Sequence, residues 1–302
     1  MSNPCKLSDN SSQIDALALW YLLKYVMKKI TKISLFMLLT LITLLLTVNF
    51  TSSPEIVGTA RHAPQHSIWH ALLQEHVSPE GWVDYEGMKG SQTQLDAYLT
   101  LLSQKTPSDS WSETEKLAYW INAYNAFTVK LIVNNYPINS IKELNPSPYI
   151  PLVNSVWTKK FFKLNGRPTN LDEIEHKMLR KKFNEPRIHF AINCASVSCP
   201  VLRNEAYTAE KVESQLADQA IRFVNNDLRN KITKDHIQIS RIFQWFKGDF
   251  TKEGNLITFL NKYSEVEIAS NAEVDYLKYD WGLNGRGEAG SDKRGGKRDN
   301  TP

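Results

Sequence analysis

Apolar residues recur at intervals of three and four along several stretches of the chain, and this spacing predicts amphipathic helices. In residues 66–77, HSIWHALLQEHV, one face gathers Trp69, Leu72, Leu73 and His76. Residues 91–104 repeat the pattern, and another such helix is predicted to begin near Thr208. Each of these helices presents one apolar face.

The most regular helix is predicted from about Glu113 to Asn135. Ser112 and Glu115 match the S-x-x-E capping box at its start, and Pro137 follows its end. Nearly every face of this helix is apolar, so we expect it to be the central element of the domain.

The same helix carries two asparagines, Asn122 and Asn125, which lie three residues apart and therefore share one flank. Buried amides require hydrogen-bond partners. Either the pair holds the backbone of a loop, which is a structural role, or an amide orients a catalytic histidine.

Short strands are predicted between the helices. The candidates are GWVDYEGM (81–88) and RIHFAINC (187–194), with hairpins around Asn165-Gly166 and within residues 231–240. This mixture indicates the α+β class, a single mixed helix/strand domain built around the long central helix.

An uncharged apolar run, ISLFMLLTLITLLLTVNF (33–50), precedes the domain and is long enough to span a bilayer. Four lysines lie within residues 24–32, and the next cation is Arg61. The positive-inside rule then leaves residues 1–32 in the cytoplasm and exports the rest. We predict a transmembrane signal anchor that holds the domain at the cell membrane, in the periplasm or another extracytoplasmic space. A cleaved signal peptide, followed by secretion, is the alternative.

The remaining boundaries follow from composition. Residues 51–65 are a polar linker, residues 66–284 the globular domain, and residues 285–302 lack a hydrophobic anchor and are predicted to be disordered. Met27 begins a stretch with the proportions of an ordinary signal sequence, so it is a candidate for the true start of the protein.

The net charge of +4 at pH 7 comes from the two ends of the chain. Residues 1–32 hold five lysines and two acids (+3), and residues 285–302 hold five basic and three acidic residues (+2). The remainder is about −1, so no nucleic-acid partner is predicted. The sequence lacks P-loop, G-x-G-x-x-G and H-E-x-x-H motifs, and its cysteine and histidine spacings match no common zinc pattern. Neither a cofactor nor a metal is predicted.

Six blocks of the sequence together resemble the family called domain of unknown function 547 (DUF547). They are VDY (83–85), YWINAYNA (119–126), LDEIEHKMLR (171–180), RIHFAINCASVSCP (187–200), IFQWFKGDF (242–250) and YDWGLN (279–284). The resemblance runs through residues 65–284. It implies one shared domain fold, which occurs in exported or membrane-anchored bacterial proteins and as a C-terminal module of plant proteins. It implies no particular reaction.

The candidate chemistry centres on HFAINCASVSCP, residues 189–200, which holds two of the three cysteines of the chain. Cys194 closes a predicted strand, a position where α/β folds often place reacting groups. Cys194 and Cys199 are candidates for a structural disulfide, which an oxidising compartment favours. Alternatively, Cys194 is a working thiol or an inert buried one.

His189 lies on the same predicted strand. Side chains alternate along a strand, so His189 and Cys194 are expected on opposite faces. His189 could then take a proton from Cys194 only if the strand bulges.

A further helix is predicted from the Asn170 cap to about Lys182. At 100° per residue, it turns Glu175 toward its apolar face and leaves His176 on the flank. A carboxylate on an apolar face either finds an ion-pair partner, for which Arg187 is the candidate, or becomes an acid/base group tuned by burial. Asp249 and Asp280 each stand beside aromatic residues and are predicted to hold the C-terminal segment in place.

The first functional hypothesis is a thiol-dependent hydrolase or acyltransferase with Cys194 as the nucleophile. Its base would be His189 or His176. Glu175 or Asn122 would orient that base.

The rival hypothesis is a non-catalytic, membrane-tethered binding module. In it Cys194 and Cys199 form a disulfide, and Trp245, Phe246 and Trp281 line a groove for a small molecule or a peptide. Thiol–disulfide exchange by the two cysteines is a third possibility.

Overall fold

The computed structural model describes residues 20–30, 63–150 and 154–286. The chain divides into two compact units, Met1–Thr59 and Ala60–Pro302. In the first unit, residues 20–30 are helical. Among the helices in these described ranges, none is long and apolar enough to cross a membrane. The predicted membrane segment 33–50 lies outside the described residues, as do most of the predicted linker and tail.

The second unit begins with four helices: α2 (Ser67–His76), α3 (Tyr85–Gly90), α4 (Gln92–Gln104) and α5 (Glu113–Val133). The predictions for α2, α4 and α5 are confirmed. The strand predicted within residues 81–88 is wrong, because only Val83 forms bridges there and the chain then turns into α3. The Asp84 side chain caps α3 by accepting a hydrogen bond from the Gly87 amide. An aspartate at this position starts a helix more readily than it continues a strand.

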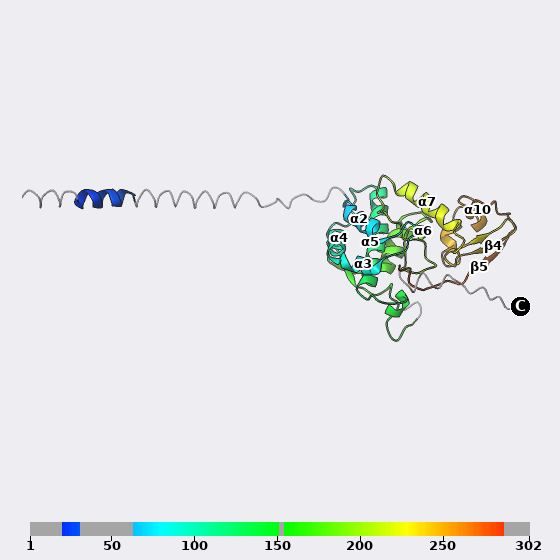
Figure 1. The fold of residues 1–302 in the computed structure, drawn as a ribbon. Helices are drawn as coiled ribbons and strands as arrows, with labels where there is room; N and C mark the ends of the chain where they lie inside the picture. Colours follow the sequence, from blue (N-terminus) through cyan, green and yellow to red (C-terminus); the bar gives the residue numbers. More distant parts are fainter. Residues whose placement is uncertain (1–19, 31–62, 151–153, 287–302) are drawn as a thin grey trace, which may run out of the picture. The chain divides into compact units, whose positions relative to one another are not determined.

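Helix α5 is the centre of the unit. Its capping box forms as expected, with the Glu115 amide donating to Ser112 Oγ and the Ser112 amide donating to Glu115 Oε2. From Leu117 onward nearly every side chain of α5 is buried, which confirms the prediction of a central helix. In Figure 1, α2, α3 and α4 gather around α5 at one end of the unit.

The middle of the chain contains η1 (Ile141–Leu144) and a hairpin of β1 (Phe162–Leu164) and β2 (Arg167–Thr169). The hairpin turn is confirmed at Asn165 and Gly166, whose φ angles are 49° and 74°. Asparagine and glycine tolerate this left-handed conformation better than other residues.

The helix predicted from Asn170 to Lys182 forms, and Asn170 Oδ1 accepts from the Glu173 amide at 2.7 Å. Its middle, η2 (Glu173–Arg180), is wound as a π-helix. A π-helix holds more residues per turn than an α-helix, and such segments are frequent at functional sites. The 100° spacing used for the sequence prediction therefore does not hold within η2.

The strand predicted over residues 187–194 is also wrong, because the chain forms α6 (Ile188–Ala191). All four residues of α6 are buried, and a short apolar run buried on every side does not distinguish a strand from a helix. Because there is no strand here, the expectation that His189 and Cys194 point to opposite faces of a strand no longer applies.

The rest of the unit starts with α7 (Val212–Val224). A three-stranded sheet follows, with β3 (Lys231–Ile232) antiparallel to β4 (His236–Ile239) and β5 (Glu273–Tyr276) parallel to β4. The short helices α8 (Ile242–Trp245), α9 (Lys247–Phe250) and α10 (Leu256–Leu260) connect β4 to β5. Figure 1 shows β4, β5 and α10 at the end of the unit away from α4.

The result is a mixed α+β unit that is mostly helical and carries two small sheets. Its core consists of two hydrophobic clusters, one around α5 and one under the three-stranded sheet. The second cluster is dominated by phenylalanines: Phe190, Phe223, Phe243, Phe250 and Phe259. Phe190 comes from α6, so α6 and the segment that follows it lie between the two clusters.

Candidate thiol site

A cavity of about 230 Å³, here called the Cys194 cavity, opens beside Cys194. Its aromatic lining comprises Tyr124, Trp157, Trp245, Phe246, Tyr279 and Trp281. Its titratable lining, apart from tyrosines, comprises Asp172, Glu175, His176, His189, Cys194 and Cys199. The structure therefore brings the predicted thiol, both candidate bases and Glu175 to one cavity, although they come from η2, α6 and the loop after α6.

The loop that carries Cys194 is fixed by its own backbone. Ala195 has a φ of 59°, which is unusual for a residue with a side chain and costs on the order of 1 kcal/mol. Asn193 Oδ1 accepts from the Ala195 amide at 2.8 Å, and Cys199 Sγ accepts from the Cys194 amide at 2.9 Å. Strained turns held by surrounding hydrogen bonds are typical of positions where a side chain must be presented in one orientation.

Asn125 of α5 supports this loop from below. Its Nδ2 donates to the Ala191 carbonyl at 3.0 Å, and its Oδ1 accepts from the Asn193 amide at 2.8 Å. Asn122 serves a different segment, since its amide bonds both the carbonyl and the amide of Tyr207. Both asparagines therefore bind loop backbone, and the hydrogen bonds of Asn122 go to Tyr207 and not to a histidine.

Both cysteines are free thiols, so the predicted Cys194–Cys199 disulfide is not formed. Cys194 is partly exposed, with its sulfur 3.1 Å from Ser196 Oγ and 3.3 Å from the Tyr279 hydroxyl. Cys199 is buried.

The two thiols have opposite acidities. A hydrogen bond from Cys199, together with those from Ser196 and Tyr279, outweighs burial and lowers the pKa of Cys194 to about 7. Burial and the neighbouring Cys194 raise the pKa of Cys199 well above its usual value. Cys194 is therefore the thiol that ionises first and Cys199 the one that stays protonated.

His189 is held by Asp249. The His189 ring is almost fully buried, with its Nε2 2.8 Å from Asp249 Oδ2, and it stacks on Phe246 with centroids 4.0 Å apart. Burial lowers the pKa of His189 although the hydrogen bond that it donates to Asp249 acts in the opposite direction, so the ring is neutral at neutral pH. Because a carboxylate only accepts, Nε2 carries the proton and Nδ1 carries the lone pair.

Asp249 also accepts a hydrogen bond from Arg180 Nε at 2.6 Å. Burial alone would raise its pKa, but the bonds from His189 and Arg180 hold the pKa of Asp249 well below its usual range. The sequence predicts only a structural role for Asp249, because His189 and Asp249 are 60 residues apart and no local pattern joins them.

His176 is the more exposed histidine. Its Nδ1 accepts from Arg180 at 2.9 Å, and its Nε2 lies 3.4 Å from Asp172. With Nδ1 occupied by an arginine, the neutral ring has no free lone pair to take a proton from a thiol.

Glu175 lies at the cavity without an ion-pair partner within 4 Å among the described residues. Burial raises the pKa of Glu175 to about 6, against the lowering effects of the nearby His176, of the hydrogen bond from Tyr124 and of Arg180. The predicted Glu175–Arg187 pair is wrong, because Arg187 bonds Glu185 at 2.7 Å and Glu213 at 2.8 Å.

The C-terminal segment closes the site. The Asp280 carbonyl accepts from the Ser198 amide at 3.2 Å, and Asp280 Oδ1 accepts from the Gly282 amide at 2.8 Å. The Asn284 amide donates to the Ala195 carbonyl at 3.3 Å. This segment delivers Tyr279 and Trp281 to the cavity, and Tyr279 is a site residue that the sequence analysis missed.

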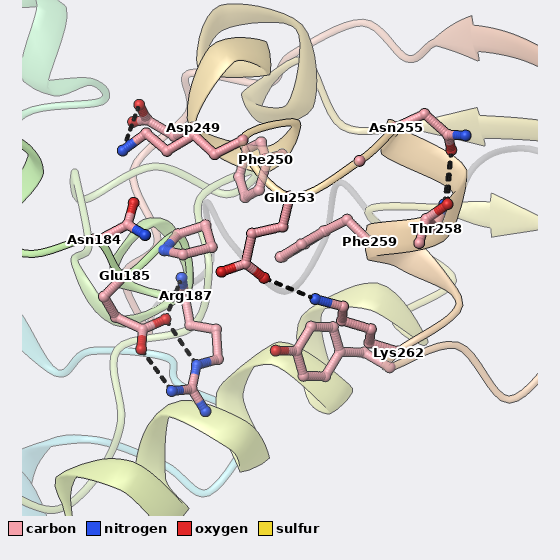
Figure 2. A pocket seen from close by; sticks show the side chains of 14 residues that line it. Asn184, Glu185, Arg187, Asp249, Phe250, Glu253, Asn255, Thr258, Phe259 and Lys262 are labelled. Carbon is pink, nitrogen blue, oxygen red and sulfur yellow. Dashed lines mark hydrogen bonds and ion pairs between the residues drawn. The ribbon is translucent and has the colours of Figure 1, made fainter.

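A second and larger cavity of about 320 Å³, here called the Arg187 cavity, has Asp249 in its lining. Figure 2 shows its lining, in which Arg187 is paired with Glu185 and Lys262 with Glu253. Its charged groups thus neutralise one another, and no cysteine or histidine lines it. Despite its size, it lacks a group that could act as a nucleophile in the way Cys194 could.

No three histidine, cysteine, aspartate or glutamate side chains converge as metal ligands within residues 20–30, 63–150 and 154–286.

Residues 108–224 match the model of the family described as "Protein of unknown function, DUF547". The match includes Asn125, Glu175, His189 and Cys194, whereas Asp249 and Tyr279 lie beyond it. No curated protein and no solved structure matches the chain. The family description assigns no reaction, so a function has to be argued from the site.

Proposed function

We propose that this DUF547 chain is a thiol-dependent hydrolase or acyltransferase in which Cys194 is the nucleophile and His189 the base. One observation carries the proposal: a partly exposed thiol of lowered pKa and a histidine held by Asp249 line the same cavity. A nucleophile, a base and a carboxylate that orients the base are the parts that acyl transfer requires. Asp249 thereby takes the orienting role that the sequence analysis gave to Glu175 or Asn122.

In the proposed reaction, His189 Nδ1 accepts the thiol proton and the Cys194 sulfur attacks the carbonyl carbon of the substrate. A carbon–sulfur bond forms, the bond to the leaving group breaks, and the proton passes from His189 to the leaving group. Water or another acceptor then attacks the thioester and gives its proton to His189. The sulfur departs and takes that proton back, which restores the free thiol.

Alkylation by iodoacetamide, mapped by mass spectrometry on the purified full-length protein without reductant, tests the nucleophile. We expect Cys194 to react at least ten times faster than Cys199, with a half-maximal rate near pH 7. Peptide mapping separates Cys5 from both. The variant Cys199→Ser is the matched control and should still be alkylated at Cys194. If neither Cys194 nor Cys199 reacts before reduction, the two form a disulfide and the nucleophile proposal fails.

Acyl transfer itself is measured with p-nitrophenyl acetate as the acyl donor. We expect release of p-nitrophenolate together with an acetylated Cys194, and we expect Cys194→Ser to lose both. A protein that is alkylated at Cys194 but never acylated would instead point to thiol–disulfide exchange with Cys199.

A binding module is the second candidate function, and the observation that favours it is the aromatic lining, where Trp245 is 46% exposed. It does not involve the disulfide of the original hypothesis. If Cys194→Ser bound a ligand as tightly as the wild-type protein and neither protein transferred an acyl group, this reading would replace the enzyme.

We also propose that residues 33–50 anchor the domain at the cell membrane, with the domain in the periplasm or another extracytoplasmic space. The support is the apolar run and the lysines before it. Carbonate extraction of membranes separates an anchored protein, which stays in the pellet, from the secreted alternative, which does not.

A further inference from the structure

Four aromatic rings form a continuous wall of the Cys194 cavity. The ring of Trp281 lies 4.6 Å from Tyr279, 5.6 Å from Trp157 and 5.9 Å from Trp245, measured between centroids. Trp245 is 46% exposed, so this part of the wall is open to solvent. The wall offers π-faces that attract cations as well as apolar groups.

Among the permanently charged side chains that line the same cavity, all are acidic, although His176 lines it as well and Arg180 lies close enough to lower the pKa of Glu175. Asp172 and Glu175 contribute carboxylates, and no lysine or arginine is among the residues that line it. Asp172 has His176 at 3.4 Å, whereas Glu175 has no ion-pair partner in the part of the chain that the structure describes. The Arg187 cavity differs, because Arg187, Lys252 and Lys262 line it beside its acids.

One cationic side chain already contacts the aromatic wall, from outside the cavity. Lys142 Nζ lies 5.1 Å from the centroid of Trp281, although Lys142 is not a lining residue. Arg180 similarly lies 4.8 Å from Phe246, where Asp249 neutralises it. These contacts are independent signs that the rings around the cavity accept positive charge.

We propose that the Cys194 cavity recognises a cationic alkylammonium group, which contacts the aromatic wall and is neutralised by Glu175. This deepens the proposed function and rests on it in one respect: the cation is taken to belong to the acyl substrate. The proposed reaction does not use Glu175, so its carboxylate, which accepts a hydrogen bond from Tyr124, remains available for recognition. The volume of about 230 Å³ is small for a ligand site and suits one residue-sized group better than a whole large ligand.

A matched pair of probes tests the charge alone. Choline and 3,3-dimethyl-1-butanol have the same shape, but only choline is cationic. Binding to the purified full-length protein is followed by tryptophan fluorescence and by calorimetry. Because a cation–π contact combined with an unpaired carboxylate favours the charged probe, we expect choline to bind at least tenfold more tightly than its neutral isostere. Equal binding of the two probes, or binding of neither, overturns the proposal.

Two variants locate the effect. Glu175→Gln should weaken choline binding about tenfold and leave the neutral probe unaffected. Glu253→Gln removes a carboxylate from the Arg187 cavity and is the matched control that should change neither. If Glu175→Gln folds poorly, Asp172→Asn gives a second reading, with a smaller loss because Asp172 already has His176 nearby. Full choline affinity in both variants would contradict recognition by these carboxylates.

The outcome is separable from that of the proposed function. If Cys194 is acylated but choline and its isostere bind equally, the proposal of an acyl-transfer enzyme is supported and the proposal of a cationic substrate is contradicted. If choline binds selectively but Cys194 is inert to alkylation and acylation, the proposal of a cationic ligand is supported and the proposal of an enzyme is contradicted.

Discussion

The two cavities of the second unit meet at one pair of residues, yet they are built in opposite ways. His189 lines the Cys194 cavity, and its partner Asp249 lines the Arg187 cavity. The Arg187 cavity is the larger, at about 320 Å³ against about 230 Å³. Its charges are mutually paired, as Figure 2 shows for Glu253 and Lys262. In the smaller cavity, Glu175 has no ion pair with any residue that the structure describes, and the pKa of Glu175 is raised while that of Cys194 is lowered.

This difference indicates that volume is a poor guide to chemistry. A charged side chain that is already in an ion pair interacts only weakly with a substrate. An unpaired buried charge lowers the stability of the fold, so it is retained mainly where it takes part in binding or reaction. We therefore expect substitutions around the Cys194 cavity to separate stability from reactivity, and substitutions of the exposed, paired charges of the Arg187 cavity, such as Glu253, to leave both nearly unchanged. Three sets of substitutions test this contrast, in order of decreasing effect on stability.

Replacing Asp249, the residue that joins the cavities, should have the largest effect. Asp249→Ala leaves Arg180 and His189 without their carboxylate, and we expect it to lower the free energy of unfolding at pH 7 by about 3 kcal/mol. Because the native pKa of Asp249 lies below its unfolded value, its contribution is present above about pH 4 and is lost as the pH falls toward 2. Urea unfolding at several pH values checks this.

The wild-type and Asp249→Ala curves should converge at low pH. Glu253→Gln removes only an exposed pair with Lys262 and should change stability by no more than about 0.5 kcal/mol. If the Asp249→Ala deficit were the same at pH 2 as at pH 7, the carboxylate would not be stabilised by charge.

The sequence anticipated the parts of the fold that depend on local signals. The capping box at Ser112 and the hairpin at Asn165-Gly166 form as predicted because neighbouring residues alone define them. The strand predicted across His189 failed because the run is buried on every side, so its pattern carries no period.

The candidate site was predictable in composition but not in geometry. Cys194, His189, His176 and Glu175 were recognised from their residue types, and all four line one cavity. The partner of His189 was not recognised, because a contact across 60 residues is created by tertiary packing. The π-helical winding of η2 likewise depends on packing, and it made helical-wheel angles an unreliable guide to Glu175.

The two asparagines of α5 give the second test, since they are alike in burial and differ in what they hold. Asn125→Ala and Asn122→Ala each leave one backbone amide and one carbonyl without a buried partner, which should cost about 2 kcal/mol in either case. Only Asn125 supports the loop that presents Cys194. We expect Asn125→Ala to slow alkylation of Cys194 severalfold and Asn122→Ala to leave the rate unchanged, both measured below the unfolding transition. Equal slowing in both variants would show that the rate follows overall stability rather than the loop.

Glu175→Gln should change the free energy of unfolding least. The sign of this change is informative, because we expect the substitution to stabilise the protein. Burial raises the native pKa of Glu175 to about 6, above its unfolded value of 4.5, so the ionised form is disfavoured in the folded state. The folded protein binds the additional proton between about pH 6 and pH 4.5, and wild-type stability gains from this group as the pH falls through that window. The Glu175→Gln side chain, by contrast, resembles the protonated acid at every pH.

The free energy of unfolding of the variant should therefore exceed that of the wild type by about 1 kcal/mol at pH 7.5. This difference should vanish near pH 4.5. Chemical unfolding at both pH values measures it. A destabilised variant at pH 7.5 would mean that the Glu175 carboxylate supports the fold. A stabilised one would mean that the fold retains a costly charge beside Cys194, as expected of a group kept for a ligand.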